Sequence, residues 1–305
     1  MNARTKTGVS IVPGSFSAWV VGIRPKTLPA ALAPVLVGTA IAIRAGGFHW
    51  GAALAAMVSA LLLQIASNLA NDVFDFEQGK DTAGRLGPVR AVQSGLLSPQ
   101  QVRTGLIIVL LFCLTVGSYL VGKAGWPLII VGLASILSAV AYTAGPFPLG
   151  YHGLGDLFVF VFFGPVAVIG TAYVQCECLS IEAVWASIPI GLLTTNILAV
   201  NNLRDMAEDS RTGKRTLAVR FGKRFATRQT RYCWIVAYLA PLYFCWVTRR
   251  PWPLLLPLAT LPFAHKWYKA VLVAEGRALN ALLAMSAQLL LAYAVLFSIS
   301  LVISP

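Results

Sequence analysis

Residues 68–81 read NLANDVFDFEQGKD and directly follow a long apolar run, residues 52–66. Four of the eleven acidic side chains of this 305-residue chain lie in this stretch. A second acidic group, Asp205, Glu208 and Asp209, also follows a long apolar run. Carboxylates at the edge of a bilayer are costly unless they have a partner, so both groups are predicted to form a functional site. A divalent metal ion is the expected partner, because hard cations select oxygen ligands.

The composition is that of a membrane protein. The chain is 57% hydrophobic and 11% charged, with a mean hydropathy of +0.74, whereas soluble domains contain about 25% charged residues. Apolar runs of membrane-spanning length recur along the whole chain. Lipid offers the backbone no hydrogen bonds, so the spans must be helices or a closed barrel. Long runs without alternation exclude the barrel. We therefore predict an all-α polytopic membrane protein.

Nine transmembrane helices are expected from the apolar runs. They lie at about residues 27–45, 51–72, 100–121, 126–144, 156–174, 182–203, 229–247, 252–270 and 279–302. Polar loops are expected at about 76–98 and 145–155, and a long basic loop at about 204–228. The polar first 15 residues lead into a full span, so no cleavable signal is expected.

The net charge of +13 is interpreted through membrane topology and not as nucleic-acid binding. With a cytoplasmic N-terminus, only Arg44, Lys123, Arg249 and Arg250 of the 24 Lys and Arg residues fall on the outer side. The other 20 fall on the cytoplasmic side, as the positive-inside rule requires. We predict a multi-pass protein of the bacterial cytoplasmic (inner) membrane, with both acidic groups facing the cytoplasm and the site opening there.

The two acidic segments resemble each other. Asn68-x-x-x-Asp72 is matched by Asn201-x-x-x-Asp205, and a Gly-Lys pair follows each of them, at 79–80 and 213–214. The two preceding spans run in the same direction. This pattern indicates a single transmembrane domain, 1–305, built by a parallel duplication of about 20–145 and 156–275.

Helical spacing places the acidic side chains of each segment on one face. The oxygen ligands expected to converge on one cavity are Asn68, Asp72 and Asp75 from the first helix end and Asn201, Asp205 and Asp209 from the second. Several close carboxylates repel unless cations balance them. Magnesium is usually held by one or two carboxylates plus substrate phosphates, so we predict Mg²⁺ bridging the protein to a diphosphate.

Basic side chains follow both acidic segments and suit the phosphate oxygens of such a substrate. The candidates are Lys80, Arg85, Arg90, Arg204, Lys214 and Arg215, although the positive-inside rule alone also explains loop cations. A diphosphate that belongs in a membrane suggests an allylic isoprenyl diphosphate, whose tail is apolar. Metal-assisted loss of diphosphate would form an allylic cation. Tyr142 could stabilise this cation through its ring, or be an ordinary interfacial tyrosine.

The spacing of Cys176-Glu-Cys178 resembles half of a metal site, but no second cysteine pair has suitable spacing. Buried or interfacial thiols are the expected interpretation of all five cysteines.

The ordered motifs resemble the UbiA superfamily of intramembrane aromatic prenyltransferases over essentially the full chain, and within it the branch that prenylates 1,4-dihydroxy-2-naphthoate. The motifs are RPKTLP (24–29), NLANDVFD (68–75) with GKD (79–81), GPVR (87–90), YTAGPFPL (142–149), GLGD (153–156), FFG (162–164), GTAYVQ (170–175), NNLRD (201–205) and GKRTLAVR (213–220).

The resemblance implies a nine-helix bundle around a central cavity, with two Asp-rich motifs that bind Mg²⁺ and a polyprenyl diphosphate. Carried over by position, the first motif also includes Asp81, as metal ligand or loop anchor, because the family's usual third acidic position is Gly79 here. The implied reaction joins the polyprenyl chain to 1,4-dihydroxy-2-naphthoate with loss of CO₂ and diphosphate, giving demethylmenaquinone. The alternatives are another acceptor, such as 4-hydroxybenzoate, or a transporter of anionic solutes.

Overall fold

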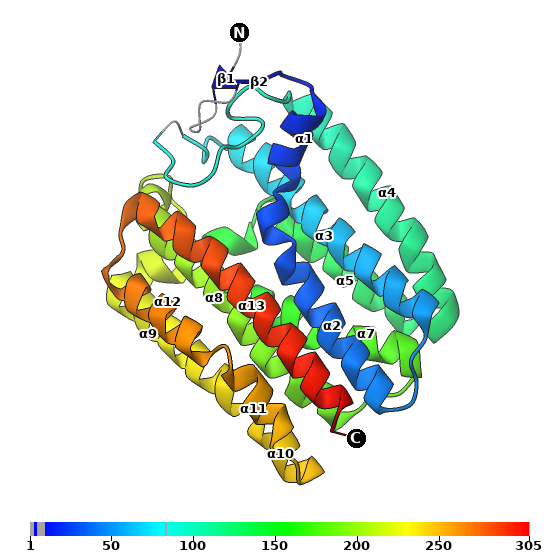
Figure 1. The fold of residues 1–305 in the computed structure, drawn as a ribbon. Helices are drawn as coiled ribbons and strands as arrows, with labels where there is room; N and C mark the ends of the chain where they lie inside the picture. The colour runs from blue at the N-terminus through cyan, green and yellow to red at the C-terminus, as the bar shows by residue number, and fades with distance from the viewer. Residues whose placement is uncertain (1–2, 5–9, 83, 305) are drawn as a thin grey trace.

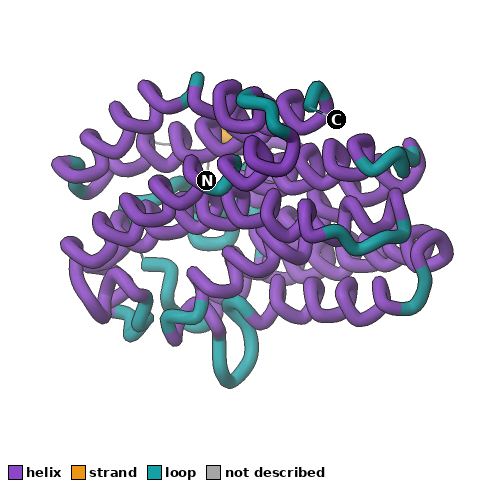
Figure 2. Tube along the Cα trace, turned by 90° about the horizontal axis from the view of Figure 1, so that it is seen from below, coloured by secondary structure: helices purple, strands orange, loops and turns teal. Residues whose placement is uncertain are grey.

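The apolar runs of the sequence form helices. The computed structural model describes residues 3–4, 10–82 and 84–304, and in this part the regular structure is helical apart from one antiparallel pairing of two-residue strands, β1 (Ala3–Arg4) with β2 (Ser10–Ile11). Figure 2 shows helices over almost the whole trace. The prediction of an all-α protein is confirmed.

The helices follow the chain back and forth along one bundle (Figure 1). The first half contains α1 (Phe16–Ile23), η1 (Pro25–Thr27), α2 (Pro29–Arg44), α3 (Trp50–Glu77), α4 (Pro99–Ala124) and α5 (Pro127–Ala141). The middle contains η2 (Leu149–His152), α6 (Gly155–Val161), the π-helical turn η3 (Phe162–Val166), α7 (Ala167–Cys176) and α8 (Ile181–Arg211). The last part contains α9 (Leu217–Leu239), α10 (Leu242–Thr248), α11 (Trp252–Leu258), α12 (Leu261–Val273), η4 (Gly276–Ala278) and α13 (Leu279–Val302).

Each predicted span overlaps a helical stretch, but the count of nine spans is not confirmed. Within the described residues, five helical segments are long and apolar enough to cross a membrane, namely Trp50–Glu77, Pro99–Ala124, Gly155–Cys176, Ile181–Arg211 and Gly276–Val302. The segments Phe16–Thr27 and Pro29–Arg44 make a sixth if they form one span bent by 50°. Helix α5 has 15 residues, and α10, α11 and α12 are short pieces.

The prediction of a long basic loop at about 204–228 is wrong. Helix α8 continues to Arg211 and α9 begins at Leu217, so only residues 212–216 connect them. The Thr216 hydroxyl caps α9 by accepting from the Val219 backbone N–H, as side chains at helix N-termini commonly do. Gly213 has φ +78°, which glycine adopts without strain. The acidic segment after 204 is therefore helical, and this fixes the directions of its side chains.

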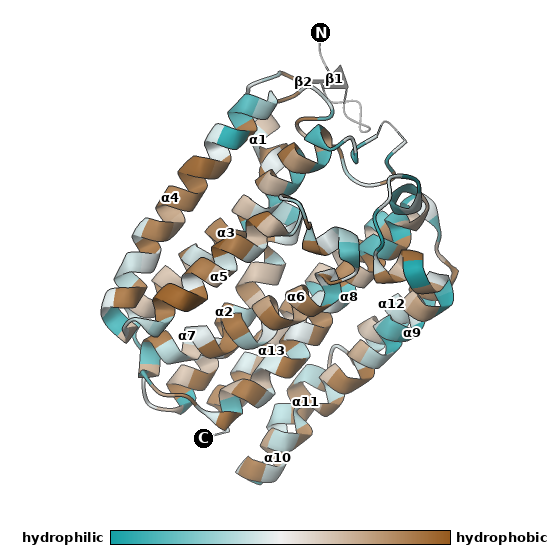
Figure 3. Ribbon diagram, turned by 180° about the vertical axis from the view of Figure 1, so that it is seen from behind, coloured by the Kyte–Doolittle hydropathy of each residue, from teal (hydrophilic) through white to brown (hydrophobic). Residues whose placement is uncertain are grey.

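The core lies where α13 packs between α2 and α8. Tyr293 and Phe297 of α13 are fully buried there, and the Tyr293 hydroxyl donates to the Ala237 carbonyl oxygen at 2.7 Å. Hydrophilic residues gather at one end of the bundle, around the end of α8 and the start of α9 (Figure 3). We call this the charged end. Helix α3 also ends there, so both acidic segments meet at one end.

Candidate active site

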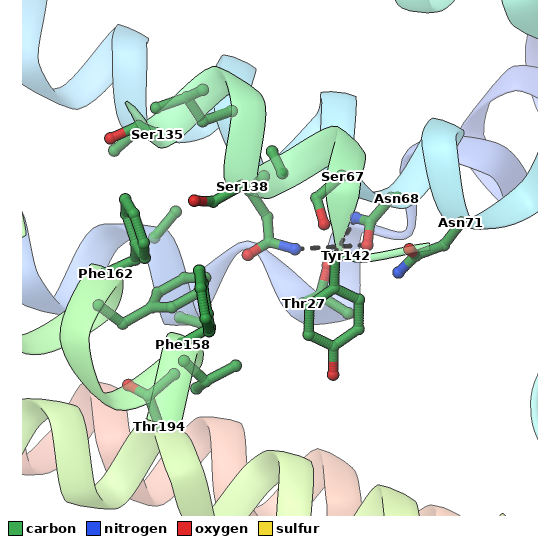
Figure 4. Close-up of a pocket in the computed structure, with 18 of the residues that line it drawn as sticks. Thr27, Ser67, Asn68, Asn71, Ser135, Ser138, Tyr142, Phe158, Phe162 and Thr194 are labelled. Carbon is green, nitrogen blue, oxygen red and sulfur yellow. Dashed lines mark hydrogen bonds between the residues drawn. The ribbon is translucent and has the colours of Figure 1, made fainter. Parts of the chain in front are cut away.

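A cavity of about 1060 Å³ opens among α2, α3, α4, α5, α8 and α13 and the segment from α6 to α7. Most of its wall is apolar, with Phe158 and Phe162 facing it as in Figure 4. The charged lining gathers toward the charged end, where both acidic segments contribute side chains. The cavity therefore has the shape of an apolar chamber with an ionic mouth.

Asp75, near the end of α3, is the centre of the first half of this mouth. The residue is 2% exposed, and its carboxylate accepts hydrogen bonds from Lys214 Nζ at 2.9 Å and Arg90 Nη2 at 3.1 Å. The Tyr151 hydroxyl donates to the same carboxylate. Lys214 comes from the connection after α8, so residues 139 positions apart meet at one carboxylate.

Asp72 does not line the cavity, contrary to the expectation that it projects there with Asp75. Its two carboxylate oxygens accept the backbone N–H groups of Ala91 and Val92 at 2.9 and 3.3 Å, and the side chain is fully buried. The α3 face that meets the cavity is rotated toward Asn71. Asp72 therefore holds the turn after residue 90 against α3.

Two asparagines of α3 line the cavity in different states (Figure 4). The Asn68 side-chain amide donates to the Ile23 carbonyl oxygen at 2.8 Å and to Thr27 Oγ1 at 2.9 Å. The Asn71 Oδ1 atom is buried and has no hydrogen-bond partner. A buried acceptor without a donor is costly, so this atom is suited to a ligand. Asn71 was missed from the sequence.

The sequence did contain a signal for Asn71. Asn71-x-x-x-Asp75 has the same spacing as Asn201-x-x-x-Asp205, as does the pair Asn68 and Asp72. Two overlapping matches were therefore possible, and the structure brings Asn71 and Asp75 into the cavity together.

Asp205, on α8, is held by its neighbour in sequence. Arg204 donates from Nε to Asp205 Oδ1 at 2.7 Å and from Nη2 to Asn201 Oδ1 at 2.8 Å. It also donates from Nη1 to Asn280 Oδ1 at 3.0 Å, and Asn280 donates to the Leu86 carbonyl oxygen at 2.9 Å. Arg204 is buried and does not line the cavity, so it acts on the site by holding Asn201 and Asp205.

The remaining acids of the mouth differ in their contacts. Asp209 lines the cavity and is buried, and Glu208 accepts the Thr82 hydroxyl. Asp81 is paired with Arg85 and Arg90 Nε, the latter at 3.3 Å, and does not line the cavity. Burial raises the pKa of Asp81 to about 6, against the lowering effect of Arg85. This geometry fits Asp81 as an anchor of the loop.

The predicted basic residues separate into two groups. Lys80, Arg85, Arg90 and Lys214 line the cavity, whereas Arg204 does not. Arg215 is exposed outside the cavity, and only its backbone N–H connects to the site, through the Tyr151 carbonyl oxygen at 2.7 Å. Arg215 as a substrate-binding side chain is therefore not supported by its position.

Two tyrosines flank the mouth. Tyr142 follows the end of α5 and points its ring into the cavity (Figure 4). Tyr151, which was missed, lies under both lysines, with Lys214 Nζ 4.6 Å and Lys80 Nζ 5.7 Å from its ring centroid. Burial and the Asp75 charge raise the pKa of Tyr151, so its hydroxyl keeps its proton. No sequence pattern distinguished Tyr151 from other loop tyrosines.

The oxygen donors suit a hard cation. Asp75, Asp205, Asp209, Asn201 and the unpaired Oδ1 of Asn71 line one end of the cavity. Within the part of the chain that the structure describes, no three His, Cys, Asp or Glu side chains are close enough to hold a metal by themselves. Mg²⁺ keeps several waters and takes few protein ligands, so these residues fit Mg²⁺ bound together with a phosphate group.

The fold and the cavity define a class of protein, helical membrane proteins whose apolar chamber ends in an ionic mouth. Within that class, the chain belongs to the UbiA prenyltransferase family, whose model matches residues 31–288. Two curated relatives are each named 1,4-dihydroxy-2-naphthoate octaprenyltransferase. The Escherichia coli (strain K12) relative is 45% identical, with 69% of this chain and 70% of the relative covered. The Haemophilus influenzae relative is 36% identical, with 93% and 96% covered.

Solved structures agree with this fold. An apo UbiA homolog from Aeropyrum pernix K1 matches with a TM-score of 0.69 at 15% identity, covering 92% of this chain and 98% of that one. A UbiA homolog from Archaeoglobus fulgidus, solved bound to DMAPP and Mg²⁺, matches with a TM-score of 0.61 at 13% identity, covering 94% and 99%. These structures support the fold, and the family model and the curated relatives confirm the resemblance to the UbiA superfamily and the expectation of a prenyltransferase.

Proposed function

We propose that the protein transfers a polyprenyl chain from an allylic polyprenyl diphosphate to 1,4-dihydroxy-2-naphthoate, with loss of CO₂ and diphosphate. The product is demethylmenaquinone in its quinol form. The observation that supports this most is the meeting of Asn71 and Asp75 with Asn201 and Asp205 at one end of an apolar cavity. The names of the bacterial relatives support the naphthoate acceptor.

The ionic mouth suits the diphosphate. Lys80, Arg85 and Lys214 offer donors to its oxygens, while Asn71, Asp75, Asn201, Asp205 and Asp209 offer ligands for Mg²⁺. When bound, Mg²⁺ supplies Lewis-acid stabilisation of the leaving diphosphate. The apolar chamber would hold the prenyl tail, and burial of each CH₂ group contributes about 0.8 kcal/mol.

The bond changes follow from this placement. The allylic C–O bond breaks with its electron pair going to the diphosphate, and the prenyl carbon gains cationic character. The rings of Tyr142, Phe158 and Phe162 face the cavity and can stabilise that charge through their π faces. The naphthoate ring carbon that bears the carboxylate then forms the new C–C bond. Loss of CO₂ returns an electron pair to the ring and restores its aromaticity.

Arg24 is suited to the acceptor's carboxylate. It lines the cavity beside the α3 asparagines, and its Nη2 atom is buried without a hydrogen-bond partner. A guanidinium matches a carboxylate in two-point geometry. Such a contact would orient the naphthoate until decarboxylation.

The same proposal includes location. The charged end, with Lys214 at the site and the exposed Arg220 and Arg224 in the first part of α9, would face the cytoplasm by the positive-inside rule, in the bacterial inner membrane. The polyprenyl diphosphate would enter from the surrounding lipid.

The test uses membranes that contain the full chain, with 1,4-dihydroxy-2-naphthoate, an allylic polyprenyl diphosphate and Mg²⁺. We expect a prenylated naphthoquinone, no product with EDTA, and recovery on adding Mg²⁺. Product with 4-hydroxybenzoate and none with the naphthoate would overturn the acceptor. Chelator-resistant turnover would overturn the metal.

A further inference from the structure

The end of α7 and its connection to α8, together residues 176–180, lie at the end of the bundle opposite the charged end (Figure 1). The 31 residues of α8 separate the two ends, which is roughly 45 Å at the rise of an α-helix. This segment contains Cys176, the last residue of α7, followed by Glu177 and Cys178, and none of the three lines the cavity. The two cysteines are therefore spatially separate from the proposed prenyl-transfer site.

The two thiols are in contact. Cys176 Sγ and Cys178 Sγ lie 2.6 Å apart, and both residues are free thiols in this structure. Glu177, between them, has φ +54°, and this left-handed residue ends α7 and turns the chain. Cys178 is exposed and Cys176 is half-buried, so the pair can meet a reagent from solvent. A disulfide needs about 2.05 Å between the sulfurs, so only a small closing movement separates the pair from a bond.

The connection joins several elements at this end. A Cβ atom on Gly47, in the turn between α2 and α3, would lie 2.4 Å from the Cβ of Cys176, so the two turns are tightly packed. Lys123, near the end of α4, pairs with Glu177 at 3.5 Å. The Gln175 side-chain amide donates to Thr39 Oγ1 of α2 at 3.1 Å. These contacts hold the end of α7, with Cys176 and Glu177, against α2, α4 and the turn after α2.

We propose that Cys176 and Cys178 form a disulfide in the membrane-embedded protein, making this turn a redox modification site. The oxidant is a protein disulfide of the extracytoplasmic compartment. One cysteine thiolate attacks that disulfide and releases one thiolate of the oxidant, giving a mixed disulfide. The second cysteine thiolate displaces the remaining oxidant sulfur. Two electrons pass to the oxidant, and the two protons that the cysteines lose end on its two thiols.

The compartment follows from the orientation under Proposed function. Because the charged end would face the cytoplasm, this turn would face the oxidising side, where disulfides persist. The pairing itself rests on the contact between the sulfurs and not on the prenyl-transfer chemistry.

The experiment uses the full chain with Cys113, Cys233 and Cys245 replaced by alanine, in membranes quenched with acid. Free thiols are blocked with N-ethylmaleimide, disulfides are then reduced, and new thiols are labelled with a maleimide–polyethylene glycol. We expect two labels per chain after reduction and none without it. The matched controls C176S and C178S in the same background each keep one thiol, which is blocked in the first step and takes no label.

Blocking of both thiols in the first step would overturn the proposal. A membrane-impermeant maleimide applied to intact cells that produce C176S should label Cys178, and failure of that labelling would overturn the choice of compartment. Prenyl transfer is measured separately in membranes that contain the unsubstituted chain, because Cys113 lines the cavity. Loss of activity there with an intact disulfide would count against the proposed function alone.

Discussion

The two acid-bearing helix ends hold their carboxylates in opposite ways. On α3, Asp75 is bound by residues from elsewhere, namely Arg90, Tyr151 and Lys214. On α8, Asp205 is bound by the adjacent Arg204 of the same helix. A carboxylate held by distant segments depends on the loops being closed, whereas one held by its own helix is oriented as soon as the helix forms. We therefore expect the α3 half to respond to loop changes and the α8 half to be pre-formed.

The two ends also differ four residues further on. Asp209 lines the cavity four residues after Asp205, while the equivalent position after Asp75 is Gly79, with φ +66°. The α3 helix has ended at Glu77, so a side chain at 79 would not continue its face. The following Asp81 instead pairs with Arg85 and Arg90. The α3 half thus offers Asn71 and Asp75 as candidate metal ligands, whereas the α8 half offers Asn201, Asp205 and Asp209.

The largest effect is expected for Asp75→Asn. This change removes a candidate metal ligand, leaves the charge of Lys214 without its carboxylate partner, and leaves Arg90 with Asp81 alone. Prenyl transfer should fall by about 10³-fold, as for loss of a main electrostatic group in an active site. The measurement is the initial rate per folded protein in membranes. The matched control is Glu77→Gln, on the same helix turn, whose carboxylate pairs with Arg103 outside the cavity. Equal losses in both variants would contradict the assignment.

A smaller effect separates the two asparagines of α3. Asn71→Ala should lower the rate by roughly 10- to 100-fold and raise the Mg²⁺ concentration needed for half-maximal rate, because the unpaired Oδ1 is lost. Asn68→Ala should mainly lower the melting temperature, since its amide ties α3 to Ile23 and Thr27. A Mg²⁺ titration of both variants tests the difference. If only Asn68→Ala shifted the Mg²⁺ requirement, the metal-binding pair on α3 would be Asn68 and Asp72 instead of Asn71 and Asp75.

Asp72→Asn should act on stability more than on chemistry. Asparagine keeps one acceptor oxygen, so one of the buried N–H groups of Ala91 and Val92 loses its partner, at a cost of about 1–3 kcal/mol. The melting temperature should fall while the rate per folded protein stays within about tenfold of the wild type. A collapse of the rate with an unchanged melting temperature would return Asp72 to the metal site.

The smallest effect is expected for Tyr151→Phe. The ring remains under Lys214, but the hydroxyl that donates to Asp75 is gone. Loss of one such hydrogen bond corresponds to about 1 kcal/mol, or roughly fivefold in rate. The kinetic constants for the polyprenyl diphosphate measure it, with Tyr232→Phe on the exposed face of α9 as the control. A rate as low as that of Asp75→Asn would mean that the hydroxyl takes part in the reaction.

Much of this architecture was predictable. Composition excluded a soluble domain, and the ordered motifs indicated the family that the comparisons confirm. The convergence of Asp75, Asp205 and Asp209 followed from helical spacing and the topology of parallel spans. The predicted duplication stays a prediction.

The remainder depended on facts that a linear pattern does not contain. Two overlapping Asn-x-x-x-Asp matches fit α3 equally well, and only the rotation of the packed helix distinguishes Asn71 from Asn68. Arg204 looked like a phosphate ligand until its contacts with Asn201, Asp205 and Asn280 were known. Residues 204–211 looked like a loop because they are polar. They nevertheless continue α8, where Asp205 and Glu208 accept hydrogen bonds from Arg204 and Thr82.

The lysines that follow the two motifs each serve the other motif. Lys80, after the first, donates to the Thr212 carbonyl oxygen beyond α8, and Lys214, after the second, donates to Asp75 on α3. This crossing has an evolutionary consequence. A substitution in one segment alters the surroundings of the other, so the segments are constrained to change together. A chimaera that joins the first half of one family member to the second half of a distant one should lose activity. Activity should return when the connections that carry Lys80 and Lys214 both come from the same family member.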